Sequence, residues 1–134
     1  QLLAASRKLA PCPAGNAKLT PGFNLPAKWV IHAVGPIYQG GTHGEDTILA
    51  DAYQSVLSIA AKEKFHTIAF PCISTGVYGF PQSAACQISI STVLKWQANN
   101  DFPKISIFCC FLSSDTAFYA ERLEELGLLH MYSI

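Results

Sequence analysis

The chain has 134 residues, of which half are hydrophobic and 13% are charged. This composition predicts one domain with a buried core and argues against a disordered chain. Nine basic and nine acidic side chains cancel, and no run of like charge exceeds two residues. We therefore expect no broad binding of nucleic acid or of anionic membranes, whereas a groove for one phosphorylated ligand is compatible with the balance.

Hydrophobic periodicity predicts the elements of the first half of the chain. Residues 2–9 are typical of the end of a helix, and residues 17–19 of a short edge strand. Residues 28–34 (KWVIHAV) are predicted to form a strand, and residues 36–46 a loop. Residues 47–62 predict a helix, with these residues on its apolar face: Ile48, Leu49, Ala52, Tyr53, Val56, Leu57 and Ala60.

The second half continues the alternation of strands and helices. Strands are predicted at 66–73 and 104–111, and helices from Gln82 onward and over about 115–126, with Gly127 as the C-cap of the last helix. Strands that are apolar on both faces and alternate with helices favour a mostly parallel sheet covered on both sides. The expected fold class is therefore a single α/β domain, a three-layer α/β/α sandwich.

The cysteines show no spacing that predicts a disulfide framework or a zinc site. They are Cys12, Cys72, Cys86, Cys109 and Cys110. No apolar run approaches the roughly 20 residues of a membrane span, and no signal peptide heads the chain. We expect a protein of the cytoplasm, intracellular and reduced, without a membrane segment, a metal or a cofactor.

Residues 71–81 (PCISTGVYGFP) lie between a predicted buried strand and a predicted helix. Ligands bind at this edge of open α/β sheets, and the N-terminus of a helix offers free N–H groups to a phosphate. Gly76 and Gly79 let the backbone approach a ligand closely, and Ser74 and Thr75 add hydroxyl donors. The stretch predicts a loop that holds a diphosphate by backbone amides.

Other interpretations of this loop find less support. A tight strand-to-helix connection without a ligand is the simplest alternative, because glycine marks turns in general. A Walker A loop needs a Lys after the second glycine, and none follows Gly79. A phosphatase loop on Cys72 needs an Arg where Tyr78 stands, and Ser74 lies outside a G-x-S-x-G elbow.

The stretch CISTGVYGFP resembles the second ligand-binding loop of macrodomains, the ADP-ribose-binding modules. Residues 12–36 are similar to a second macrodomain stretch, in which Gly-x-Ala-x-x-Thr-x-Gly is followed by Leu-Pro and Val-Ile-His-x-Val-Gly-Pro. The matching residues are Gly15, Ala17, Thr20, Gly22, Leu25, Pro26, Val30, Ile31, His32, Val34, Gly35 and Pro36. Two motifs in the right order, with a helix between them, are more specific than either alone.

The resemblance implies a role for each residue that matches. Those implied to wrap the diphosphate and distal ribose are Ser74, Thr75, Gly76, Val77, Tyr78 and Gly79. Tyr78 is implied to lie beside that ribose, and Phe111 to stack on or edge the adenine. An aromatic side chain that caps the core is the alternative for Phe111.

Macrodomains normally open with a strand pair, an Asn-Ala-Ala-Asn segment and a glycine-rich loop, which in hydrolytic members carries residues tied to catalysis. None of these appears in residues 1–134, so we expect the later two-thirds of the domain, with the first strands and first ligand loop missing. The missing strands are expected to expose an apolar sheet flank that pairs with another copy or segment.

The resemblance implies binding of ADP-ribose or of an ADP-ribosylated substrate. In the intact protein it implies hydrolysis of O-acetyl-ADP-ribose or of ADP-ribosyl esters on proteins, by a water held between diphosphate and ribose without a metal or covalent intermediate. The alternatives are a non-catalytic reader of ADP-ribosylated proteins and a fragment without activity.

Several other side chains that attract attention are predicted to be structural or solvated. Core or packing roles are expected for His32, Trp29 and Trp96. His43, Glu45 and Asp46 lack a defined ligand spacing, and solvation is expected for them rather than metal binding. A low-pKa thiolate at Cys72 is not expected, because no His or Arg is close to it in sequence.

Overall fold

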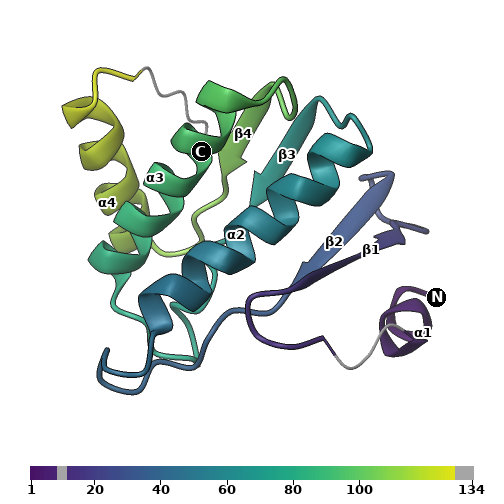
Figure 1. Cartoon of the computed structure of the whole chain (residues 1–134), viewed down its shortest axis with the longest axis horizontal. Helices are drawn as coiled ribbons and strands as arrows, with labels where there is room; N and C mark the ends of the chain where they lie inside the picture. The colour runs from purple at the N-terminus through teal and green to yellow at the C-terminus, as the bar shows by residue number, and fades with distance from the viewer. Residues whose placement is uncertain (9–11, 129–134) are drawn as a thin grey trace.

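The structure, a computed structural model, describes residues 1–8 and 12–128, so the predicted end of the first helix at residue 9 lies outside the described residues. The first helix, α1 (Leu2–Lys8), contacts β1 (Ala17–Pro21). This strand pairs antiparallel with β2 (Trp29–Ala33) (Figure 1). In this pairing Lys18 lies opposite His32. The predicted edge strand is therefore present and two residues longer than expected.

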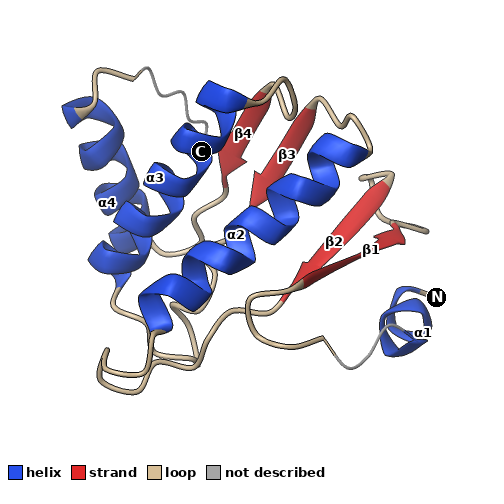
Figure 2. Cartoon of the chain, in the orientation of Figure 1, coloured by secondary structure: helices blue, strands red, loops and turns tan. Residues whose placement is uncertain are grey.

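The second strand pair supplies the parallel part of the fold. β3 (Thr67–Phe70) pairs parallel with β4 (Ile105–Phe108), and Phe70 lies opposite Phe108 (Figure 2). Both strands are shorter than the sequence predicts. β3 ends before Pro71 because proline has no N–H to donate to a ladder. The last link is the N–H of Cys109, which donates to the carbonyl of Phe70 at 2.7 Å.

Three helices run side by side: α2 (Glu45–Lys62), α3 (Gln82–Asn99) and α4 (Ser113–Glu125) (Figure 1). Helix α3 lies between the other two. Helices α2 and α4 each begin two residues before the predicted start. The predicted cap is confirmed, because Gly127 has a positive φ of 70° and Leu128 donates its N–H to the carbonyl of Leu123 at 2.9 Å. In the described residues no helix is long and apolar enough to cross a membrane.

The helix faces explain the hydrophobic core. Six of the seven residues predicted on the apolar face of α2 are buried, and only Ile48 is half-buried. Helix α3 is buried on two sides, since Ala85 and Val93 belong to the cluster around α2, whereas Cys86 and Ile90 pack with Tyr119 of α4. The sequence pattern predicts one apolar face for α3 and omits Cys86 and Ile90; that predicted face consists of Ala85, Ile88, Ser89, Thr92, Val93 and Trp96.

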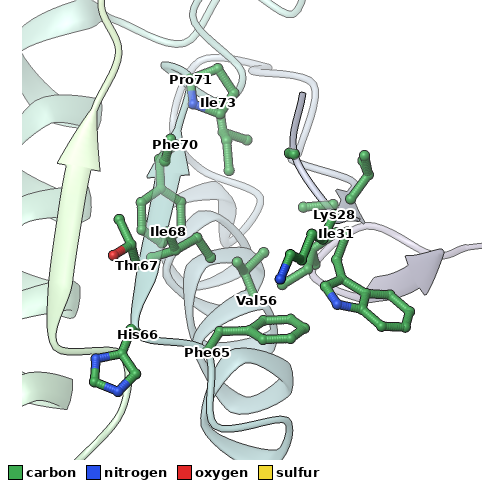
Figure 3. A pocket seen from close by; sticks show the side chains of 15 residues that line it. Lys28, Ile31, Val56, Phe65, His66, Thr67, Ile68, Phe70, Pro71 and Ile73 are labelled. Atoms are coloured by element: carbon green, nitrogen blue, oxygen red, sulfur yellow. The ribbon is translucent and has the colours of Figure 1, made fainter. Parts of the chain in front are cut away.

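The strands do not form the continuous, mostly parallel sheet that the sequence predicts. They form two two-stranded sheets, one antiparallel and one parallel. A cavity of about 720 Å³ lies between β2 and β3, with Val56 of α2 among its lining residues (Figure 3). Within the described residues, the facing edges of β2 and β3 share no ladder hydrogen bonds. The open apolar surface thus lies between the pairs rather than on one outer flank.

The three residues predicted to be structural lie in different surroundings. Trp29 is not a core residue, because it is 47% exposed and stacks on Phe65 with ring centroids 6.1 Å apart, where both line the cavity. His32 is half-buried, and its Nε2 lies 2.9 Å from the hydroxyl of Thr20 on the neighbouring strand. Trp96 packs against the core as expected and donates its indole N–H to the carbonyl of Phe102.

Candidate ligand-binding site at the strand ends

The predicted binding loop, residues 74–80, follows β3 and leads into α3. Because β3 and β4 are parallel, their carboxyl ends meet at the same edge of the sheet, and Phe111 follows β4 at that edge. The starts of α3 and α4 are also joined there, since the side-chain amide of Gln82 donates to the hydroxyl of Ser114 at 2.9 Å. The fold thus brings the loop and Phe111 to one edge.

The loop is a tight turn closed by its own backbone. The N–H of Phe80 donates to the carbonyl of Ser74 at 2.9 Å, and the N–H of Gly79 donates to the carbonyl of Gly76 at 3.0 Å. Ser74 has a φ of 67°, which a residue other than glycine rarely adopts, and Gly79 has a φ of 72°. Strained backbone of this kind is concentrated at ligand-binding sites.

The turn leaves a run of backbone donors free. Within the described residues, the N–H groups of residues 74–78 donate to no protein acceptor. Helix α3, which follows directly, has Pro81 at its N-cap and no side chain that caps its first turn. Consecutive free amides beside an uncapped helix N-terminus provide partial positive charge without any lysine or arginine.

The hydroxyl groups of Ser74 and Thr75, which the sequence predicts as donors to a ligand, are directed into the protein. The hydroxyl of Ser74 is buried without a hydrogen-bond partner in the described residues. It lies against Gly35, where an added Cβ would be 2.1 Å from Ser74 Oγ. Thr75 donates its hydroxyl to the carbonyl of Cys72 at 3.0 Å. The donors that the loop offers are therefore those of its backbone.

The remaining predicted side chains are exposed at this edge. Val77 is fully exposed, Tyr78 is 40% exposed and Phe111 is 96% exposed. The exposure of Phe111 excludes the alternative that it caps the core. A large aromatic ring that is fully accessible to solvent is available for contact with a flat ligand group.

A second loop, which sequence reasoning did not assign to the site, lies against the first. The N–H of Tyr38 donates to the carbonyl of Tyr78 at 2.8 Å, and the rings of Tyr38 and Phe80 lie 4.9 Å apart. A cavity of about 310 Å³ is lined by residues of both loops, among them Gly35, Glu45 and Tyr78. The larger cavity between β2 and β3 is apolar and includes none of residues 74–80.

Glu45, at the start of α2, is buried rather than solvated as predicted, with 2% of its surface exposed. Burial by itself raises the pKa of its carboxyl group. The backbone N–H groups of Gln39, His43 and Gly41 outweigh this effect and hold the pKa at about 2, below its ordinary 4.5. The prediction of solvation holds for the exposed side chains of His43 and Asp46. The sequence signal of the turn around Glu45 is the set of three glycines before α2, Gly40, Gly41 and Gly44, all of which have a positive φ.

The cysteines near the loop are not activated. Burial, with the neighbouring Cys110 and Asp115, raises the pKa of Cys72 to about 12. This agrees with the prediction that Cys72 is no thiolate nucleophile. In the part of the chain that the structure describes, no group of His, Cys, Asp and Glu side chains is arranged to hold a metal ion.

Comparison with known proteins identifies the family of this fold and loop. The model of the Macro domain family matches residues 1–89, which is more than half of the chain. The chain therefore belongs to the macrodomain family. The α/β fold class expected from the sequence is confirmed by the solved structures of this family, as the next comparison illustrates.

Named relatives connect the family to ADP-ribose. The chain is 46% identical to the ADP-ribose glycohydrolase MACROD2 of Mus musculus over 92% of its length and 26% of that protein. It is 41% identical to the O-acetyl-ADP-ribose deacetylase of Escherichia fergusonii over 90% of its length and 68% of that protein. The Trypanosoma brucei macrodomain in complex with ADP-ribose matches with a TM-score of 0.84 and 32% identity, over 91% of the chain and 51% of that structure.

The lowered pKa of Glu45 predicts that the folded protein loses stability in acid. The folded-state pKa of this carboxyl group is below its ordinary value. Its contribution to the free energy of unfolding is therefore complete above pH 4.5 and is lost as the pH falls towards about 2. Urea unfolding at several pH values measures this, and Glu45→Gln is expected to flatten the dependence in that range. The exposed neighbour serves as a control, and an equal flattening by Asp46→Asn would contradict the assignment.

Proposed function

We propose that the chain binds ADP-ribose at the edge formed by residues 74–80 and Phe111. The observation that carries the proposal is the run of free N–H groups at residues 74–78 beside the uncapped start of α3. A diphosphate presents several anionic oxygens within a short distance, and consecutive amides match that spacing without a basic side chain. The zero net charge of the chain fits recognition by this local cradle.

The exposed side chains complete the proposed site. Phe111 stacks on or edges the adenine, and such stacking is worth about 1–3 kcal/mol in proteins that bind single-stranded nucleic acid. Tyr78, which lines the cavity of about 310 Å³, lies beside the distal ribose. The residues proposed to contact the ligand are Ser74, Thr75, Gly76, Val77, Tyr78, Gly79 and Phe111. Ser74 and Thr75 contribute through their backbone.

For the whole protein we propose hydrolysis of an ADP-ribosyl ester, either O-acetyl-ADP-ribose or an ester on a protein. The name of the Escherichia fergusonii relative, a deacetylase, supports ester hydrolysis, and the name of the mouse relative, a glycohydrolase, supports hydrolysis of an ADP-ribose compound more generally. In the proposed reaction a water held between diphosphate and ribose attacks the ester. The second candidate is a reader of ADP-ribosylated proteins, favoured by the composition of residues 74–80 and Phe111, which offer binding groups but no carboxylate or imidazole that could serve as a general base.

Replacement of Gly76 tests the cradle directly. An added Cβ at Gly76 meets no protein atom within 4 Å, and its φ is not in the left-handed region, so Gly76→Val leaves the fold intact. We expect this variant to lose ADP-ribose affinity by more than tenfold in calorimetry, because the new side chain keeps the ligand away from the amides. Lys64→Ala and Lys95→Ala are the controls, and a larger loss in either control than in Gly76→Val would refute the cradle.

A comparison of binding with turnover tests whether residues 1–134 hydrolyse the ligand or only bind it. Binding energy is spread over adenine, phosphates and riboses, whereas hydrolysis needs a precisely placed water, and a misplacement of about 1 Å costs roughly 100-fold in rate. We expect residues 1–134 to bind ADP-ribose weakly and to hydrolyse O-acetyl-ADP-ribose no faster than buffer. The Escherichia fergusonii relative is the positive control for a deacetylation assay, and comparable turnover by the chain would establish a hydrolase within these residues.

We also propose that the chain self-associates through the gap between β2 and β3. The facing strand edges lack partners within the described residues, and apolar side chains such as Ile31 and Ile68 line the gap between them (Figure 3). Sedimentation should show a mass that rises with concentration and falls in Ile68→Lys. Ile107→Lys, on the exposed surface of β4, should leave association unchanged. A compact monomer that binds no apolar dye would rule out this proposal.

The location of the protein is a further proposal. All five cysteines are free, at Cys12, Cys72, Cys86, Cys109 and Cys110. Free thiols persist in a reducing compartment, which supports a cytoplasmic location. Fractionation of cells that express the protein measures this location.

A further inference from the structure

The carboxylate of Glu45 organises the loop of residues 38–44, which lies outside the residues proposed to contact the ligand. Its Oε2 accepts the N–H groups of Gln39 at 2.7 Å and of Gly41 at 3.0 Å, and its Oε1 accepts the N–H of His43 at 2.6 Å. The loop of residues 38–44 therefore wraps around one buried charge. Hydrogen bonds to a charged group are about twice as strong as neutral ones, so this carboxylate fixes the shape of the loop.

The 38–44 loop transmits this shape to the ligand-binding loop. The hydroxyl of Tyr38 lies against Gly41, where an added Cβ would be 2.7 Å from the Tyr38 oxygen. The ring of Tyr38 packs on Phe80, and its N–H donates to the carbonyl of Tyr78 at 2.8 Å. Tyr38 therefore lies between Gly41, which Glu45 holds, and two residues of the ligand-binding loop, Tyr78 and Phe80.

We propose that Glu45 is a positioning residue for the ligand-binding loop, acting through Tyr38 on the backbone of residues 74–80. This inference rests on the proposed function, because it assigns Glu45 a part in ADP-ribose binding without contact between its carboxylate and the ligand. The free N–H groups of residues 74–78 serve as a cradle only while the turn keeps its strained form. The 38–44 loop supplies the external contact to that turn at Tyr78.

The charge of Glu45 also suits its place beside an anion. An unpaired carboxylate near a diphosphate repels it, whereas one that accepts three N–H groups is largely compensated. Its position at the first turn of α2 adds the favourable field of the helix N-terminus. Glu45 lines the cavity of about 310 Å³, and its buried carboxylate is therefore compatible with an anionic ligand there.

Amide hydrogen exchange without ligand tests the coupling. In Glu45→Gln one amide NH₂ group faces backbone donors, so exchange should become faster at Gln39, Gly41 and His43. The positioning role requires faster exchange at three further amides as well: Tyr38, Gly79 and Phe80. Unchanged exchange in α4, which lies apart from the 38–44 loop, shows that the fold is intact. Acceleration confined to the first three amides overturns the proposal.

Two variants frame this measurement. Asp46→Asn removes the neighbouring exposed carboxylate and is expected to change none of these amides. Glu45→Asp keeps the charge on a side chain that is one methylene shorter, and intermediate exchange at Tyr38 and Phe80 is expected. If Glu45→Gln does not fold, Glu45→Asp decides the question, because unchanged exchange at Tyr38 and Phe80 in a variant with loosened 39–43 amides also overturns the proposal.

A double-mutant cycle tests the same coupling through binding. Glu45→Gln is expected to weaken ADP-ribose binding roughly tenfold, and less than about threefold in a Tyr38→Ala background, because the two residues act in series. Equal factors in both backgrounds overturn the proposal. If the wild-type chain does not bind ADP-ribose, the proposed function fails, whereas the exchange experiment still decides whether Glu45 positions the loop.

Discussion

Burial of one face of α2 against both strand pairs is the interaction on which the rest of the structure depends. The pairs β1–β2 and β3–β4 share no ladder hydrogen bonds in the described residues. Leu49, Tyr53 and Val56 lie in one core cluster that includes Phe70 of β3 and contacts Ile31 of β2. The area that α2 removes from water therefore holds together two sheets that would otherwise be independent, since two-stranded sheets are marginal by themselves.

The same helix connects the core to the proposed ligand-binding edge. Its first residue, Glu45, holds the 38–44 loop, and Tyr38 in that loop contacts Tyr78 and Phe80. The strained φ of Ser74 is tolerated because Gly35 admits the Ser74 side chain and Phe80 returns a hydrogen bond to the Ser74 carbonyl. Strain of this kind persists only where the surroundings fix it, and here Gly35 and the Phe80 hydrogen bond do so.

Periodicity predicted most of the helices and strands, and motif spacing predicted that the proposed binding loop lies between a strand and a helix, where β3 and α3 flank it. They succeeded where one segment decides the outcome, as for the buried face of α2 and the glycine cap at Gly127. They failed where a second segment decides. Cys86 and Ile90 are buried because α4 covers them, and Glu45 is buried because its own loop folds over it. The gap between β2 and β3 depends on pairing between distant segments, which no local pattern encodes.

The direction of the loop hydroxyls has the clearest consequence for function. Sequence alone suggested that Ser74 and Thr75 face a ligand, since both are donors at the right place. The structure turns one hydroxyl against Gly35 and the other onto the carbonyl of Cys72, and leaves the amides of residues 74–78 free. Backbone amides cannot be replaced by mutation of a side chain and do not titrate. The proposed site, built on such amides, would recognise the shape of an anion rather than its charge alone, and this form of selectivity suits a protein of zero net charge among many phosphorylated molecules.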